Sequence, residues 1–218
     1  GSASLMQESA ACTECGGAGF VRAGLPLGHP RFGQAIPCEN CNPVPVADGI
    51  PDELAGASFE TFLLAYNAGM VRAKQRCQAV AAGAEWCALL AGDIGTGKSH
   101  LAVAALKDSL HERPGCFWVF GDLLLFFRHA MFDLGLSEEN LVSGYQTFRG
   151  LLVFDDVGAE KLTEWAQATL YAILHARYSQ RLPTIVTTNH QSELDERIVS
   201  RFYEGLIVCR GTDIRRRQ

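Results

Sequence analysis

Short apolar runs alternate with amphipathic stretches over the last three quarters of the chain. The apolar runs predict β-strands at residues 86–91, 116–120, 151–154, 183–188 and 205–209. Apolar residues at helical spacing predict helices over residues 59–82, 98–110, 122–132, 138–148 and 163–180. This alternation is typical of parallel β-α units, in which helices cover both faces of a sheet. The pattern therefore predicts an α/β domain over residues 58–218.

The first quarter of the chain has a different character. Residues 5–42 are rich in glycine and cysteine, and residues 43–57 hold three of the eight prolines without a periodic apolar face. We interpret residues 1–42 as a small module, with residues 1–4 as the remnant of a tag, and residues 43–57 as a linker.

Composition and charge narrow the possible functions. Hydrophobic residues make up 48% of the 218 residues, which is enough for a packed core, and the formal net charge is −5. With this net charge, the protein is not expected to bind nucleic acid through a broad basic surface. No apolar run is long enough for a membrane span, and the N-terminus does not resemble a signal peptide. We therefore expect a cytoplasmic protein.

Residues 92–99, with the sequence GDIGTGKS, fit the phosphate-loop motif in full. They follow a predicted strand and open a predicted helix, so a chance glycine-rich turn is a weak alternative. Lys98 can reach the β- and γ-phosphate oxygens, and the Ser99 hydroxyl can bind Mg²⁺. We assign nucleotide contacts to Gly92, Gly95, Thr96, Gly97, Lys98 and Ser99.

Two later strands end in polar side chains that could complete this site. Asp155 and Asp156 follow the apolar run 151–154, and Asn189 follows the run at 183–188. We assign Asp155 to Mg²⁺, directly or through water, and Asp156 to an attacking water; Asn189 could hold that water against the γ-phosphate. The alternatives are an acidic strand end that caps a turn, and a turn residue at Asn189.

Four cysteines form two C-x₂-C pairs, namely Cys12, Cys15, Cys38 and Cys41. Paired soft ligands suit tetrahedral Zn²⁺; an iron–sulfur cluster and unliganded thiols are the alternatives. Residues 1–58 hold two basic and six acidic side chains, which favours docking to a protein over binding to phosphates. The other four cysteines, in apolar surroundings, are expected in the core.

The phosphate loop, the paired aspartates and Asn189, in this order, resemble the AAA+ ATPases, and in particular the DnaC/DnaI/IstB group. The resemblance covers residues 58–218. Its other carrying segments are Phe59-Glu60-Thr61-Phe62, His100-Leu101-Ala102, Val157-Gly158-Ala159-Glu160-Lys161, Arg177-Tyr178, Pro183 to Thr188, Ser200-Arg201-Phe202 and Gly211-Thr212-Asp213-Ile214-Arg215.

This resemblance implies further roles. His100 and Arg215 would join the nucleotide pocket, with Arg215 at the sensor-2 position. Arg201 would be an arginine finger that touches the γ-phosphate held by a neighbouring subunit, supported by Arg197. The usual helical lid would be absent after the last strand. Residues 122–150 would correspond to an extra helical element that lines a path for single-stranded DNA.

The function expected from this resemblance is that of a bacterial helicase loader. It would bind and slowly hydrolyse ATP with Mg²⁺, carry Zn²⁺, and deliver a hexameric replicative DNA helicase onto single-stranded DNA, with the N-terminal module gripping the helicase and the Arg201 finger mediating self-association. The alternatives are an IstB-like transposition ATPase that assembles on DNA to recruit a transposase, and a small-molecule P-loop kinase.

Overall fold

The computed structural model describes residues 20–22, 35–37, 50–62, 68–133, 135–159, 162–211 and 213. The chain forms two compact units, residues 1–44 and residues 45–218. In the first unit, strands β1 (Phe20–Arg22) and β2 (Ala35–Pro37) pair antiparallel, with Val21 opposite Ile36. The four cysteines predicted to bind zinc lie outside the described residues.

The second unit is built on a parallel five-stranded sheet. Its strands are β3 (Cys87–Gly92), β4 (Gly115–Val119), β5 (Leu151–Asp155), β6 (Thr184–Thr188) and β7 (Leu206–Cys209), in the order β4-β5-β6-β3-β7. Counted within this sheet, the order is 2-3-4-1-5. Every residue of β5 and β6 is buried, as expected for inner strands covered on both faces. The predicted α/β architecture is confirmed.

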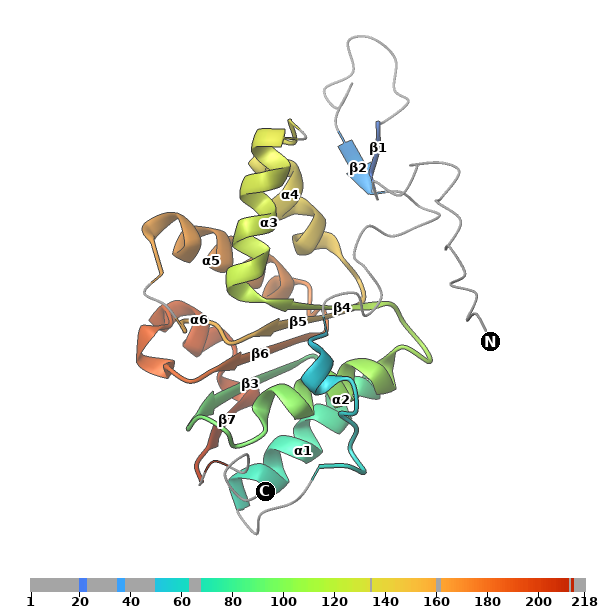
Figure 1. The fold of residues 1–218 in the computed structure, drawn as a ribbon, viewed down its shortest axis with the longest axis vertical. Helices are drawn as coiled ribbons and strands as arrows, with labels where there is room; N and C mark the ends of the chain where they lie inside the picture. The colour runs from blue at the N-terminus through green and yellow to red at the C-terminus, as the bar shows by residue number, and fades with distance from the viewer. Residues whose placement is uncertain are drawn as a thin grey trace, which may run out of the picture. The chain divides into compact units, whose positions relative to one another are not determined.

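Helices cover both faces of this sheet (Figure 1). Helices α1 (Ala68–Ala81) and α2 (Lys98–Ser109) lie on one face, and α3 (Phe120–Asp133), α4 (Glu138–Thr147) and α5 (Glu164–Ser179) lie on the other. Three 3₁₀ turns, η1 (Asp52–Leu54), η2 (Gln191–Glu193) and η3 (Tyr203–Gly205), and the short helix α6 (Glu196–Arg201) complete the described elements. No helix in these described stretches is long and apolar enough to cross a membrane.

The predicted helix at residues 59–82 is wrong in its first part, because α1 begins at Ala68. Residues 59–61 form a turn in which Ser58 and Thr61 exchange hydrogen bonds between side chain and backbone, at 3.0 and 3.1 Å. These side chains satisfy backbone groups that a helix would otherwise use. Phe59 and Phe62 are buried from this turn, so their spacing of three residues imitated a helical pattern.

One side of α1 is buried. Met70, Ala73, Cys77 and Val80 are 0–3% exposed, whereas Val71, also apolar, is 37% exposed. The observed spacing of three and four residues is that of a helix packed on one side.

Part of the stretch interpreted as a linker packs against the second unit. Ile50 and Leu54 lie against the hydrophobic core between α1, α2 and the sheet, and Ala57 is 3% exposed. Lys107 on α2 donates a hydrogen bond to the Ala57 carbonyl at 3.2 Å. Residues 50–57 therefore belong structurally to the second unit.

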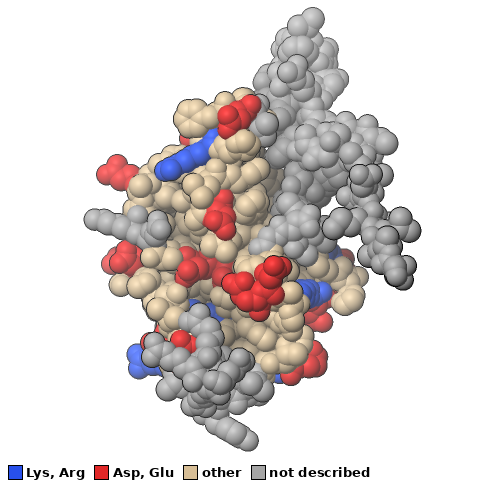
Figure 2. All heavy atoms as spheres, in the orientation of Figure 1, with Lys and Arg blue, Asp and Glu red and all other residues tan. Residues whose placement is uncertain are grey.

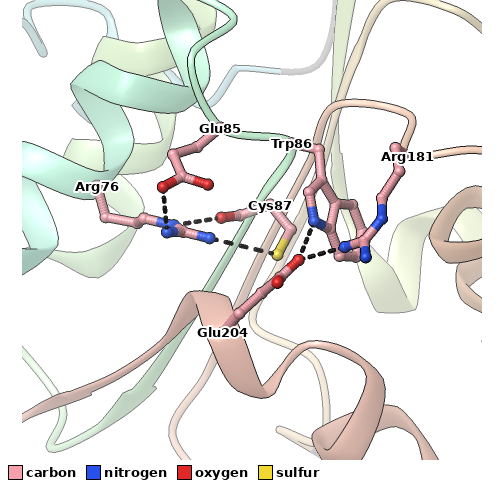
Figure 3. Close-up of polar contacts among 6 residues, drawn as sticks. All are labelled: Arg76, Glu85, Trp86, Cys87, Arg181 and Glu204. Atoms are coloured by element: carbon pink, nitrogen blue, oxygen red, sulfur yellow. Dashed lines mark hydrogen bonds and ion pairs between the residues drawn. The ribbon is translucent and has the colours of Figure 1, made fainter.

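A polar cluster fastens the start of β3 to its surroundings (Figure 3). Arg76 on α1 donates to the Cys87 carbonyl at 2.7 Å and pairs with Glu85 at 2.9 Å. Glu204 in η3 accepts hydrogen bonds from both Trp86 and Arg181. Burial raises the pKa of the Cys87 thiol to about 11, so it stays protonated near neutral pH.

The four cysteines expected in the core, Cys77, Cys87, Cys116 and Cys209, are 0–1% exposed, which confirms that prediction. All four are free thiols, and none is bonded to another.

Candidate nucleotide-binding site

The phosphate-loop motif lies where the sequence predicts it, between β3 and α2. Gly97 stands at the N-terminus of α2 with φ 93° and ψ 18°, and no side chain caps the helix there. The backbone N–H groups of the first turn therefore point toward the loop, in the arrangement that binds phosphate at a helix N-terminus.

The end of edge strand β7 holds the beginning of the loop. Gly92 has φ 135°, and a Cβ atom at this position would lie 2.2 Å from the Cys209 carbonyl oxygen, so no larger residue fits. The Asp93 N–H donates to the same carbonyl at 2.9 Å. This contact between distant parts of the chain sets the position of the loop relative to the sheet.

Lys98 is buried within the loop. Its side chain is 5% exposed, and Nζ donates to the carbonyls of Gly92 at 2.9 Å and Asp93 at 2.7 Å. Burial lowers the pKa of Lys98, opposed by the charges of Asp155, Asp156 and Asp93. An ammonium group taken out of water in this way gains from a nearby phosphate anion.

Asp155 meets the loop from the end of β5. It is 6% exposed, and Oδ1 accepts a hydrogen bond from Thr187 Oγ1 at 2.6 Å. Burial raises the pKa of Asp155, while hydrogen bonds from Thr187 and Ser99 lower it. The structure thus brings together Ser99 and Asp155, the two residues assigned to Mg²⁺.

This donor set fits Mg²⁺, which usually takes one or two carboxylates and completes its coordination with water and substrate phosphates. Within the described part of the chain, no group of three or more His, Cys, Asp or Glu side chains is arranged to hold a metal ion. The ion would therefore be held jointly by Ser99, Asp155 and the nucleotide.

Asp156 and Asn189 are also brought together. Asn189 Nδ2 donates to Asp156 Oδ1 at 2.8 Å, and Asp156 N–H donates to Thr187 Oγ1 at 3.0 Å. Asp156 has φ 53°, a left-handed conformation that aspartate and asparagine tolerate better than most residues. The carboxylate and the amide form one polar unit beside the loop.

Thr187 is the residue that sequence reasoning missed. Its hydroxyl donates to the Asp155 carboxylate and accepts from the backbone N–H of Asp156, so it orients the first carboxylate and fixes the backbone that carries the second. The signal in the sequence was the pair Thr187-Thr188, which follows apolar residues at the end of β6. This pair indicates a contact with Asp155 only once β5 and β6 are known to be neighbours in the sheet.

The segment after β7 also reaches the loop. Gly211 N–H donates to Asp93 Oδ2 at 3.0 Å. Gly95 has φ 73°, and a Cβ atom there would lie 1.9 Å from Asp213 Oδ1. The sequence did not predict this contact, and Arg215, the expected sensor-2 residue, lies outside the described residues.

Two other predicted residues contact different parts of the unit. His100 Nε2 lies 2.8 Å from the Ser58 carbonyl oxygen, and its ring lies 5.4 Å from the Phe62 ring. Arg201 contacts α5, where its Nε donates to His175 Nδ1 at 3.0 Å. Neither contact involves Lys98 or Asp155.

A surface hollow of about 1010 Å³ starts at Asn189 and continues along η2 and α6. Its lining comprises Asn189, His190, Gln191, Ser192, Leu194, Glu196, Val199, Ser200 and Tyr203. It shares Asn189 with the candidate site and contains none of residues 92–99.

The surface charges agree with the low net charge. Figure 2 shows acidic and basic side chains mixed over the described part of one face, without a broad basic area.

No family model matches the sequence, and no curated protein matches it. Among solved structures, the DnaC helicase loader is similar with a TM-score of 0.62 and 27% identity, over 73% of this chain and 100% of that chain. DnaI is similar with a TM-score of 0.59 and 22% identity, over 75% of this chain and 93% of that chain. AMPPCP-bound DnaA from Aquifex aeolicus gives 0.58 and 21%, over 70% of this chain and 50% of that chain.

The strand order, the phosphate-loop motif and the likeness to the DnaC helicase loader define an AAA+ ATPase fold. The chain shares this fold with the DnaC helicase loader, with DnaI and with DnaA.

Proposed function

We propose that the chain binds and hydrolyses ATP and delivers a replicative DNA helicase onto single-stranded DNA. The observation that carries this proposal is the similarity to the DnaC helicase loader over the full length of that chain, at 27% identity. The cluster of Lys98, Ser99, Asp155, Asp156 and Asn189 supports the ATPase part, because it joins a phosphate site, a metal site and a polar pair for water.

Each residue has a role in this proposal. Lys98 and the N-terminus of α2 hold the triphosphate, and Ser99 with Asp155 holds Mg²⁺, which supplies charge neutralisation when bound. Asp156 accepts a proton from the attacking water or polarises that water, and Asn189 orients the same water molecule. Arg201 acts on the γ-phosphate in a second copy of the chain.

Replacing Asp156 by asparagine is expected to lower ATP turnover by about 10²–10⁴-fold, the usual effect of losing a general base. Nucleotide affinity should be unchanged. Asparagine keeps an oxygen that can accept from Asn189, and it tolerates the left-handed backbone at φ 53°. Single-turnover and steady-state assays measure the effect. Asp108→Asn, which removes an exposed carboxylate from α2, is the matched control; equal turnover in Asp156→Asn and wild type would assign the base elsewhere.

The N-terminal module is proposed to hold one Zn²⁺ per chain through Cys12, Cys15, Cys38 and Cys41 and to dock on the helicase. Elemental analysis of the purified full chain should find zinc at one equivalent, and Cys12→Ser with Cys15→Ser should lose both the metal and helicase binding. Lys98→Ala should retain the zinc. Iron, or no metal, would contradict the ligand assignment, and retained helicase binding without metal would contradict the docking role.

The loader function is tested by delivery of a hexameric replicative helicase to circular single-stranded DNA. The full chain should form a complex with the helicase and start ATP-dependent unwinding on DNA coated with single-strand-binding protein, and Lys98→Ala should not. Absence of a helicase complex would reject the proposal. Binding to duplex DNA with capture of a transposase instead would favour the IstB-like alternative.

A further inference from the structure

Arg201 is held against α5 by a defined set of contacts. Its Nε donates to His175 Nδ1 at 3.0 Å, and its Nη1 donates to the Arg197 carbonyl at 2.9 Å. The guanidinium carbon lies 5.2 Å from the centre of the Tyr171 ring and 5.9 Å from that of Tyr178. Two hydrogen bonds and two ring faces restrict a side chain that is otherwise among the most mobile in proteins.

Tyr171, His175, Tyr178 and Trp86 form an aromatic surface. Three arginines border it, namely Arg181, Arg197 and Arg201, and carboxylates neutralise two of the three. Arg197 pairs with Asp195 at 2.6 Å, and Arg181 pairs with Glu204, which Figure 3 shows beside Trp86. The pKa of Asp195 is lowered chiefly by its hydrogen bond from Arg197. Arg201 differs, because its hydrogen-bond acceptors are an imidazole nitrogen and a backbone carbonyl. Among the described residues no carboxylate forms a salt bridge with it, although its charge contributes to the lowered pKa of Asp195.

The aromatic side chains support one another as well as the arginine. The rings of Tyr171 and His175 stack in parallel, with centroids 5.5 Å apart and an interplanar angle of 6°. Arg197 covers Tyr171 at 4.1 Å, and Tyr178 packs edge-on against Trp86 at 5.7 Å. Since Tyr171, His175 and Tyr178 project from successive turns of α5, most of this surface is fixed by a helix rather than by a loop.

The hydrogen bond from Arg201 determines the tautomer of His175. A guanidinium group can only donate, so Nδ1 must be the acceptor and the ring proton must be on Nε2. His175 is exposed, yet it is stacked on Tyr171 and bound to Arg201. Holding an exposed side chain in one position costs conformational entropy, and the stability of the fold gives little reason for such order at the surface.

We propose that His175 and Tyr171 are positioning residues that hold the Arg201 guanidinium ready for a phosphate presented by a second copy of this chain. The proposal rests on the proposed role of Arg201 as a finger acting across a subunit boundary. His175 fixes the direction of the guanidinium through its acceptor, and Tyr171 supports the plane of the group through its ring face.

Matched substitutions separate these contributions from general damage. His175→Leu removes the acceptor, while His175→Asn restores an oxygen near the position of Nδ1. Tyr171→Leu removes the ring face, while Tyr171→Phe keeps it. We expect the leucine variants to lose about tenfold or more in kcat, since misplacement of a reacting group by about 1 Å can cost that much. The asparagine and phenylalanine variants should stay near wild type, and KM for ATP should not change.

The decisive experiment uses pairs of inactive chains. Lys98→Ala protein has an intact Arg201 but a defective phosphate loop, and Arg201→Ala protein has the reverse. Their mixture should recover ATP hydrolysis, and this recovery is the reference. Adding His175→Leu to the Lys98→Ala chain should reduce the recovery about tenfold or more, whereas adding His175→Asn should preserve it. Tyr171→Leu and Tyr171→Phe should behave as the corresponding pair.

The outcomes distinguish the two proposals. No recovery in the reference mixture would reject the finger acting between copies. Full recovery with both leucine variants would reject the positioning role while leaving the finger in place. Equal losses for His175→Leu and His175→Asn would reject the role of the Nδ1 acceptor. In unmixed wild-type protein, the hydrogen bond to His175 should slow exchange of the Arg201 Nε–H with water, so its NMR signal should be sharper than in His175→Leu. An identical signal in the two proteins would contradict the proposal without reference to ATPase activity.

Discussion

Replacing Lys98 by alanine is expected to abolish measurable ATP binding. Lys98 is the first residue of α2, and its ammonium group is buried, with a lowered pKa and two loop carbonyls as hydrogen-bond acceptors. A phosphate would replace these with charge-assisted hydrogen bonds, each contributing about 1.5–3 kcal/mol. Loss of two such bonds weakens binding at least about a hundredfold. Titration with a fluorescent ATP analogue and calorimetry would measure the loss.

A stability measurement accompanies this test. ATP at saturating concentration should raise the melting temperature of the wild-type protein and leave that of Lys98→Ala unchanged, because only a ligand that binds the folded state stabilises it. Lys107→Ala, on the same helix, is the matched control and should respond to ATP like wild type. Wild-type affinity in Lys98→Ala would reject the assignment of the phosphate loop.

Replacing Arg177 by methionine should cause the largest loss of stability among the described arginines. Arg177 on α5 is 0% exposed, and burial lowers its pKa to about 10. Its guanidinium group donates five hydrogen bonds of 2.7–3.0 Å, to Thr184 Oγ1 and to the carbonyls of Tyr145, Phe148, Gly150 and Pro183. All five acceptors are neutral. Because they lie in or after α4, just before β5 and at the start of β6, the side chain joins these three elements.

Methionine fills a similar volume but leaves these acceptors unsatisfied, so the free energy of unfolding should fall by about 3–5 kcal/mol. For a protein of this size, the melting temperature should fall by about 10 °C. Arg177→Lys should recover only part of this, because a single ammonium group has three donors and cannot span the same carbonyls. Arg72→Met, at an exposed position on α1, is the control and should change stability by less than about 0.5 kcal/mol. Urea denaturation followed by circular dichroism measures all three, and equal stability of Arg177→Met and wild type would contradict this account.

The features predicted correctly from the sequence depend on neighbouring residues in the chain. Residues 151–154 of strand β5 are all apolar and buried, as expected for a strand covered on both faces, so this run is recognisable in the sequence alone. The phosphate loop likewise requires glycines, lysine and serine at fixed spacing between a strand and a helix, so one segment contains the whole motif. Helix α1 shows the limit of local patterns. Phe59 and Phe62 have helical spacing but are buried from a turn that Ser58 and Thr61 stabilise.

The features that only the tertiary structure decided arise from contacts between distant segments. Thr187 bonds Asp155 across 32 residues of sequence because β5 and β6 are neighbours in the sheet. Gly92 must be glycine because the Cys209 carbonyl approaches from β7. Arg177 in α5 and Arg201 in α6 are charged residues that a sequence pattern alone would place on a solvated helix face. In the structure, Arg177 is buried among carbonyl groups and Arg201 is held by His175. A sequence states which side chains are present, while the strand order of the sheet determines which of them meet.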